Sequence, residues 1–269
     1  MRGRWVWLWL LVAMVAVSGC GGDSERTVIT EAGSTTVQPL AERLAEAFTA
    51  EHPEVEVIVQ GGGSSVGIKS AGEGTVDVGA ASREVRASEL ESYPDLRVFV
   101  IARDGIAVVV HPDVPVEGLT VEQVRAIFAG QITNWKEVGG DDRPIIVVAR
   151  EEGSGTRGAF EELVMGERRI TGGAVLQASN GAVRTTVSTT PDAIGFLSFG
   201  YLGDGVKPLA VDGVAPTEAN AADGRYPLVR PLNLLTKGEP QGAVKAWLDF
   251  IFSEAGQAIV ADEGYIPVR

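Results

Sequence analysis

Short apolar runs rich in β-branched residues alternate with helical patterns along the chain, and this alternation restricts the fold more than any other feature. Strands are expected near residues 28–30, 55–59, 76–79, 97–102, 106–111, 145–149, 193–199 and 232–236. Helices are expected between them, at 39–50, from a Thr120 capping box to Ala129, and at 244–259. Repeated strand–helix alternation is typical of a mostly parallel sheet. The sequence therefore predicts an α/β fold.

Two extended stretches divide the chain into candidate lobes. The apolar run 98–111 is interrupted at 103–105, and the stretch 226–237 runs toward the C-terminal helix. The roughly 250 residues after residue 19 are enough for two moderate cores. Two crossings between such cores predict a two-lobed clamshell. Its lobe I would consist of residues 27–104 and 230–269, and its lobe II of residues 105–229.

The first 19 residues have the pattern of an export signal peptide. Arg2 and Arg4 precede an apolar run over 5–17, which is shorter than the 18 or more residues of a membrane span. Cys20 follows small residues, as in the lipobox of bacterial lipoproteins, where the cysteine is lipidated. This resemblance predicts a lipid anchor at Cys20 and a flexible tether over 20–26. The alternative is an incidental cysteine beside an ordinary cleavage site.

Cysteine content and charge exclude several classes of function. Cys20 is the only cysteine, so the chain forms no internal disulfide and no cysteine-based metal cluster. Residues 1–19 hold Arg2 and Arg4 and no acidic residue, so the remainder has 21 basic and 36 acidic side chains and a net charge of −15. Nucleic acids require a basic surface, which this chain lacks. An anionic ligand must therefore be held by local donors.

Four turns rich in small residues each follow an apolar run. They lie at 32–36, 61–65, 77–82 and 150–157. Glycines allow a ligand to approach the backbone, and hydroxyl-rich turns that open helices offer N–H groups and the positive end of the helix dipole. Helix starts that follow strands meet at one edge of an open α/β sheet. The turns therefore predict a cage for a small oxyanion.

Two of these turns imitate enzyme signatures. Residues 63–67 match G-x-S-x-G, and the order Ser65, Asp77, His111 fits a hydrolase triad. However, the chain has only two histidines, both precede proline, and His111 lies only 46 residues after Ser65, so a serine hydrolase is a disfavoured alternative. Residues 153–158 match the dinucleotide pattern G-x-G-x-x-G, but the preceding acids and the extra hydroxyls favour a phosphate-binding helix start over a nicotinamide site.

Asp77 and Arg150 bring charge to the predicted cage. Arg150 can place two N–H groups on an oxyanion, and Asp77 can accept a hydrogen bond from a proton that the anion carries. Such an acceptor rejects sulfate, because a fully ionised anion leaves the carboxylate facing negative charge. The alternatives are a capping Asp77 and an exposed Arg150. We expect Glu152 to pair with Arg150, the alternative being a surface acid, and Asn180 either to line the opposing lobe or to cap its helix.

Several motifs together resemble one family. Gly33–Thr36, Gln60–Gly67, Val76–Ala80 and Arg150–Thr156 occur in the order and spacing of the phosphate-binding proteins of ABC-type phosphate transport systems. Residues 130–135 and 192–196 resemble further landmarks of this family, so the resemblance covers essentially all of the chain after the signal peptide. Two departures are Thr36, where an aromatic residue can stand, and Glu152, which replaces a frequent aspartate.

The resemblance implies a type II periplasmic-binding-protein fold, whose lobes close on one dehydrated phosphate without catalysis and without a cofactor. It implies a membrane-embedded permease as the partner of an exported, membrane-anchored protein, which we expect to be a monomer. The implied phosphate contacts are Ser34, Thr35, Thr36, Ser64, Asp77, Arg150, Ser154, Gly155 and Thr156, with Ser65, Glu152 and Asn180 as further candidates. Another oxyanion, such as molybdate, tungstate or sulfate, and a cell-surface interaction module are the alternatives.

Overall fold

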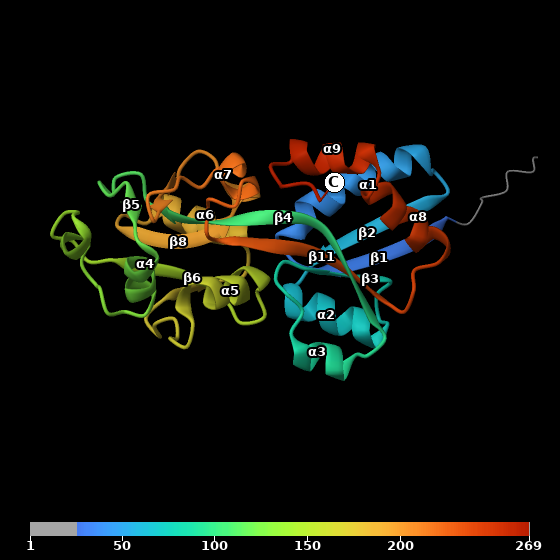
Figure 1. The fold of residues 1–269 in the computed structure, drawn as a ribbon, viewed down its shortest axis with the longest axis horizontal. Coiled ribbons are helices and arrows are strands. Elements are labelled where there is room, and N and C mark those ends of the chain that lie inside the picture. The colour runs from blue at the N-terminus through green and yellow to red at the C-terminus, as the bar shows by residue number, and fades with distance from the viewer. Residues whose placement is uncertain (1–25, 269) are drawn as a thin grey trace, which may run out of the picture.

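The structure is a computed structural model that describes residues 26–268. The chain forms two lobes that lie side by side and are joined by two long strands, β4 (Leu96–Val110) and β11 (Val229–Lys237) (Figure 1). The predicted signal peptide, Cys20 and almost all of the predicted tether lie outside the described residues. Within the described part, no helix is long and apolar enough to span a bilayer.

A nine-stranded sheet runs through both lobes in the order β2-β1-β3-β11-β4-β8-β6-β7, with β9 paired to β4. Strand β1 is parallel to its two neighbours, β2 and β3. Strand β11 is antiparallel to both of its neighbours, and β6 is parallel to β7 and β8. The other strands of this sheet are β1 (Thr27–Gly33), β2 (Val55–Gly61), β3 (Val78–Ala81), β6 (Ile146–Arg150), β7 (Val175–Gln177), β8 (Ala193–Ser198) and β9 (Lys207–Pro208). A separate two-stranded sheet consists of β5 (Gly118–Leu119) and β10 (Ala210–Val211). The predicted α/β class is confirmed.

The helices alternate with strands, as predicted, and the last two follow the last strand. They are α1 (Val37–Glu51), α2 (Ser64–Glu73), α3 (Ala87–Ser92), α4 (Val121–Phe128), α5 (Gly155–Phe160), α6 (Asn180–Thr189), α7 (Glu218–Ala222), α8 (Gly242–Ile251) and α9 (Glu254–Asp262). The predicted capping box is confirmed, because Thr120 Oγ1 accepts from the Gln123 N–H and the Gln123 side chain accepts from the Thr120 N–H.

The single helix predicted at 244–259 is wrong. The chain breaks after α8, and Ser253 caps a second helix, α9, by accepting a hydrogen bond from the Gly256 N–H. A Cβ at Gly256 would lie 2.2 Å from the Phe250 carbonyl oxygen, so only glycine permits this tight junction. One amphipathic face runs along both helices, and periodicity alone does not reveal the break.

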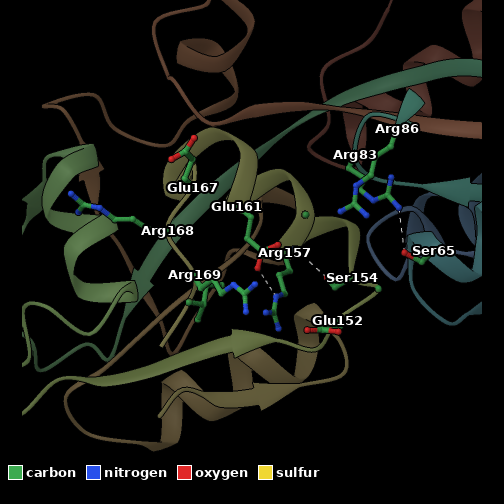
Figure 2. Close-up of a pocket in the computed structure, with 14 residues that line it drawn as sticks. Ser65, Arg83, Arg86, Glu152, Ser154, Arg157, Glu161, Glu167, Arg168 and Arg169 are labelled. Atoms are coloured by element: carbon green, nitrogen blue, oxygen red, sulfur yellow. Dashed lines mark hydrogen bonds and ion pairs between the residues drawn. The ribbon is translucent and has the colours of Figure 1, made fainter. Parts of the chain in front are cut away.

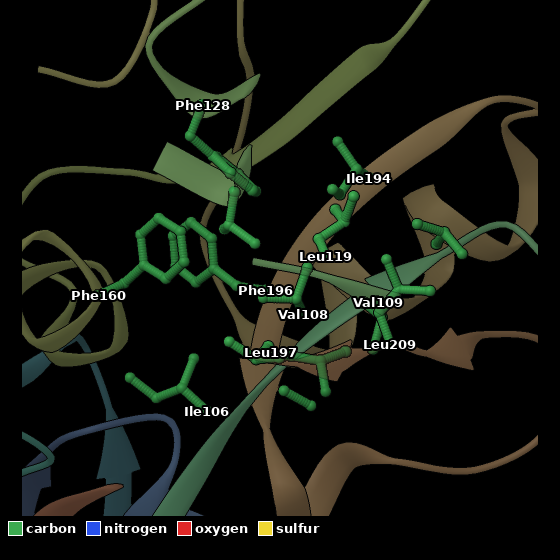
Figure 3. Packing of buried hydrophobic residues seen from close by; sticks show 14 of the residues in the cluster. Ile106, Val108, Val109, Leu119, Phe128, Phe160, Ile194, Phe196, Leu197 and Leu209 are labelled. Atoms are coloured by element: carbon green, nitrogen blue, oxygen red, sulfur yellow. The ribbon is translucent and has the colours of Figure 1, made fainter. Parts of the chain in front are cut away.

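The hydrophobic core is divided at the two connecting strands. One cluster takes all its buried residues from the span 106–228, and Phe160 and Phe196 stack inside it with ring centroids 4.0 Å apart (Figure 3). A second cluster draws on 29–102 and 232–265. Each lobe therefore buries its own apolar surface.

Residues 103–105 do not interrupt a strand, which corrects the prediction of two separate strands there. All three lie within β4, and Asp104 is opposite Arg230 in the β4–β11 ladder. Asp104 is buried and forms an ion pair with the buried Arg230, whereas Arg103 is exposed. An unbroken strand passes from one lobe to the other.

Candidate functional site

The site lies where the lobes meet, at the carboxyl ends of parallel strands. β1 ends at Gly33, β3 at Ala81 and β6 at Arg150, and each leads into a turn that carries hydroxyl groups. Helices α1, α2, α5 and α6 begin beside these turns, and the N–H groups of a first helical turn have no carbonyl partner within the helix. This edge is where open α/β sheets bind ligands.

Four buried hydroxyl side chains form two close pairs. Thr36 Oγ1 lies 3.1 Å from Thr156 Oγ1, and Ser64 Oγ lies 3.4 Å from Ser82 Oγ. A Cβ at Gly155 would be 2.1 Å from Ser64 Oγ and 2.6 Å from Ser82 Oγ, so the start of α5 packs directly on both serines. The predicted turns at 32–36, 61–65 and 150–157 therefore converge on one cluster. The turn at 77–82 contributes only its last residue, Ser82.

Arg150 is buried at the end of β6 and is held by the protein backbone. Its Nε donates to Gln177 O at 3.1 Å, and its Nη2 donates to Ala178 O at 2.8 Å and to Thr35 Oγ1 at 3.2 Å. Its Nη1 is buried with no hydrogen-bond partner. Burial, reinforced by the charge of Arg230, lowers the pKa of Arg150 to about 10. A desolvated guanidinium with a spare donor favours an anion beside it.

Arg230 and Asp104 were not predicted, yet both belong to the cluster. Arg230 donates from Nη2 to Asp104 Oδ2 at 2.8 Å and to Thr36 Oγ1 at 3.1 Å, and from Nη1 to Ser82 O at 3.0 Å. Desolvation raises the pKa of Asp104, and the neighbouring Arg230 opposes that rise. Neither residue lies in a recognisable motif, because strand pairing brings together positions 126 residues apart.

Asn180 joins the cluster from the opposing lobe. It is fully buried, and its Nδ2 donates to Thr36 Oγ1 at 2.8 Å. Its helix is capped by Ser179, whose Oγ accepts from the Ala182 N–H, so of the two predicted roles for Asn180 the structure has the first. Tyr201 also crosses between the lobes, since its hydroxyl donates to Thr35 O at 2.8 Å.

Ser34 and Ser154 lie at the cluster, but their hydroxyl oxygens accept hydrogen bonds from helix starts. Ser34 Oγ accepts from the N–H groups of Thr36 and Val37, at the start of α1. Ser154 Oγ accepts from the Arg157 N–H and caps α5. Each hydroxyl keeps one proton to donate elsewhere.

The acceptor role predicted for Asp77 is wrong. Asp77 is exposed and precedes β3, so it lies at the amino end of that strand, whereas the cluster lies at the carboxyl end. Its carboxylate accepts from the N–H and the hydroxyl of Thr30, four residues before Ser34 along β1. At a rise of about 3.3 Å per residue, this places Asp77 roughly 13 Å from the cluster. Ser82 ends the same segment and contributes a hydroxyl instead.

The predicted pairing of Glu152 with Arg150 is also wrong, because backbone carbonyls occupy that guanidinium and Glu152 is exposed. Glu152 and Ser65 line a neighbouring cleft of about 670 Å³ between the lobes (Figure 2). Three of its arginines are paired: Arg83 with Glu89, Arg157 with Glu161 and Arg168 with Glu122. Three of the five arginines that line the cleft are therefore charge-compensated, and the buried cluster with the unpaired Nη1 of Arg150 is the better anion site.

The geometry gives no support to a hydrolase at Ser65. Its hydroxyl accepts a hydrogen bond from Arg83 Nη2 at 3.3 Å. The two histidines are engaged elsewhere, His52 beside Glu54 and Phe48, and His111 with Asp113. Neither is placed to take a proton from Ser65.

A two-lobed α/β molecule that buries N–H and O–H donors where its lobes meet has the architecture of a solute-binding protein. The chain matches the family described as PBP superfamily domain over residues 21–255, and it belongs to that superfamily. It is 39% identical over 256 residues to the phosphate-binding protein PstS of Bacillus subtilis, covering 93% of this chain and 84% of the relative. The phosphate-binding protein PstS of Pseudomonas aeruginosa strain PAO1 is 30% identical over 278 residues, with the same coverage.

Solved structures agree with the sequence relatives. A Clostridium perfringens structure, described as a phosphate ABC transporter substrate-binding protein with bound phosphate, has a TM-score of 0.87 at 41% identity and covers 90% of this chain and 100% of its own. An ABC-type phosphate transport receptor from Vibrio cholerae has a TM-score of 0.76 at 38% identity, covering 88% of this chain and 99% of its own. The predicted two-lobed fold and the family resemblance are confirmed.

Proposed function

We propose that this protein binds inorganic phosphate between its lobes and delivers it to an ABC transporter. The observation that carries the proposal is the buried, unpartnered Nη1 of Arg150, on a guanidinium whose Nη2 donates to Thr35 Oγ1 of the other lobe. A phosphate dianion supplies the acceptors that such donors need. The relatives described as phosphate-binding, and the phosphate-bound C. perfringens structure, support the same ligand.

The proposed contacts are those sequence-predicted residues that the structure brings together. They are Ser34, Thr35, Thr36, Ser64, Arg150, Ser154, Gly155 and Thr156, with Asn180 bonded to Thr36 from the opposing lobe. We propose lobe boundaries at 104/105 and 229/230, in keeping with the two separate hydrophobic clusters. Closure around β4 and β11 would let phosphate stabilise the state that the permease recognises.

The remaining features extend the proposal beyond the site. We infer that the protein performs no catalysis, acts as a monomer, is exported and is held at the membrane by a lipid on Cys20. Replacement of Cys20 by serine should release the protein from membranes while leaving phosphate binding intact. A Cys20→Ser variant that stays with the membrane fraction would refute lipid anchoring and leave the ligand proposal untouched.

Calorimetric titration of the purified protein with phosphate, sulfate, molybdate and tungstate tests the ligand. Phosphate should bind with the highest affinity and compete with each of the others. Equal affinities, or tighter binding of molybdate or tungstate, would identify a different oxyanion-binding protein. Absence of binding by all four would overturn the proposed function.

A further inference from the structure

Arg230 occupies an unusual place for a residue that no sequence motif includes. It lies on β11, one of the two strands that join the lobes, and its side chain is almost fully buried. Its guanidinium donates to three residues at once: Asp104 through Nε and Nη2, Ser82 through Nη1, and Thr36 through Nη2. Two of these partners, Ser82 and Thr36, carry hydroxyls of the cluster that we propose to bind phosphate.

The orientation of the Asn180 amide is set by its other contacts. The Ser198 N–H donates to Asn180 Oδ1 at 3.3 Å, and a backbone N–H requires an acceptor. Nδ2 is therefore the atom that points at Thr36 Oγ1, where it donates at 2.8 Å. The Thr36 hydroxyl thus meets an N–H donor from each of two sides, Arg230 and Asn180.

These two donors determine the direction of the Thr36 hydroxyl. A hydroxyl has one proton and two lone pairs, and here both lone pairs receive N–H donors. Its proton must then be donated outward, and the Thr156 oxygen lies 3.1 Å away. Once Thr156 accepts from Thr36, its own proton is free to be donated. Among the described residues, the Thr156 hydroxyl donates only a long hydrogen bond of 3.4 Å to Asn180 Oδ1.

We propose that Arg230 is a positioning residue, which acts through the hydroxyl of Thr36 to make Thr156 a hydrogen-bond donor to bound phosphate. This inference rests on the proposed function. Asp104 holds the guanidinium in place from β4, so the strands that join the lobes also orient the donors of the ligand cage. The Thr156 proton is then available to the ligand, and an ionised phosphate oxygen is a stronger acceptor for it than P–OH.

A double-mutant cycle tests this role, using Arg230→Lys and Thr36→Val. Lysine keeps the charge but cannot reach Asp104, Ser82 and Thr36 together. Arg230→Lys alone should weaken phosphate binding about tenfold, the size of one charge-assisted hydrogen bond. In the Thr36→Val background the same change should cost less than about twofold, because the hydroxyl through which Arg230 acts has gone. Arg225→Lys, at an exposed arginine paired with Asp223, is the matched control.

The pH profile supplies a second readout. In the unchanged protein, phosphate affinity should fall as the dianion becomes protonated, and Arg230→Lys should flatten this dependence because Thr36 no longer fixes Thr156 as a donor. If Arg230→Lys does not fold, Asp104→Asn loosens the same guanidinium while every hydroxyl stays in place, and the cycle is repeated with it. An equal loss in both Thr36 backgrounds would overturn the positioning role alone. Failure of the unchanged protein to bind phosphate would instead overturn the proposed function.

Discussion

Arg150 is the residue whose substitution should weaken phosphate binding most. Lysine at this position would keep a charge but lose the planar fork that bonds Thr35 and two backbone carbonyls while a further donor stays free. Arg150→Lys should therefore weaken phosphate binding by about 10- to 100-fold. Titration calorimetry measures the change, with exposed Arg225→Lys as the control. Affinity that stays within about twofold of the unchanged protein would exclude a direct contact.

Substitution of Asp77 should have no effect on phosphate binding, because Asp77 lies away from the site. Asp77→Asn should leave phosphate affinity and the preference for phosphate over sulfate unchanged. It should lower the free energy of unfolding by about 1 kcal/mol at most, since the carboxylate accepts two hydrogen bonds from Thr30 at an exposed position. Urea unfolding and competition titration check the two parts. A lost preference for phosphate would restore Asp77 as the acceptor.

At the residue scale, local sequence motifs predicted the site residues that lie on or beside turns. Thr36, Ser64, Arg150 and Thr156 stand next to glycines and helix starts, which are visible in a single short window of sequence. Arg230 was not predicted, because its contact with Thr36 joins positions 194 residues apart. The predicted role of Asp77 is wrong because the sequence pattern of an aspartate beside a short strand is the same at the amino and carboxyl ends. Only the pairing of β3 with β1 shows that Asp77 lies at the amino end.

Among the elements, periodicity predicted the existence of the main strands and helices better than their continuity. The residues at 103–105 predict an interruption between two strands. They instead remain within β4, because Asp104 and Arg230 form an ion pair across the β4–β11 ladder. The opposite error occurred at 244–259, where an unbroken amphipathic pattern covers two helices separated at Ser253. In both cases a tertiary contact decides the outcome, an ion pair in the first and the packing of Gly256 against Phe250 in the second.

The packing of β1 against α8 buries one carboxyl group and should make stability depend on pH. Glu31 is buried with Oε1 unpaired, and Trp247 Nε1 donates to Oε2 at 3.3 Å. Burial raises the pKa of Glu31 from 4.5 to about 8. The folded protein therefore keeps a proton on Glu31 that the unfolded chain releases, so the Glu31 contribution to stability is full below about pH 4.5 and is lost as pH rises toward 8.

Glu31→Gln should remove this dependence, since glutamine is isosteric and does not ionise. The unchanged protein should lose up to about 1.4 kcal/mol of unfolding free energy per pH unit within that window, relative to the variant. Urea unfolding of both proteins at about pH 5 and about pH 8 measures the difference. Parallel pH profiles would show that the Glu31 carboxyl does not hold its proton in the folded state.

On the scale of the whole molecule, the lobes meet through small residues and direct hydrogen bonds. The Ser65 N–H donates to Gly153 O at 3.1 Å, Tyr201 donates to Thr35 O, and Asn180 donates to Thr36. Glycines make this approach close: a Cβ at Gly63 would lie 3.0 Å from Gly153 O, and one at Gly158 would lie 2.9 Å from Arg83 Cδ. The described conformation is therefore one in which the lobes are in direct contact beside the proposed phosphate site.

Gly155 is the position at which a single methyl group should hold the lobes apart. Its Cβ would lie 2.1 Å from Ser64 Oγ and 2.6 Å from Ser82 Oγ, both on the opposite lobe. Because Gly155 lies in the first turn of α5 without a positive φ, alanine costs its backbone nothing there and favours the helix. Gly155→Ala should therefore leave the unfolding temperature without phosphate unchanged or slightly raised, while it weakens phosphate binding at least tenfold.

Small-angle scattering with and without phosphate separates this effect from simple loss of a contact. The unchanged protein and the control Gly172→Ala, whose added Cβ meets no atom within 4 Å, should become more compact when phosphate is added. Gly155→Ala should keep the larger radius of gyration even at phosphate concentrations that saturate it, because the steric barrier opposes closure and not only affinity. Full compaction of the saturated variant would mean that Ser64 and Ser82 yield to the methyl group, and that the close contact at Gly155 does not control the closed state.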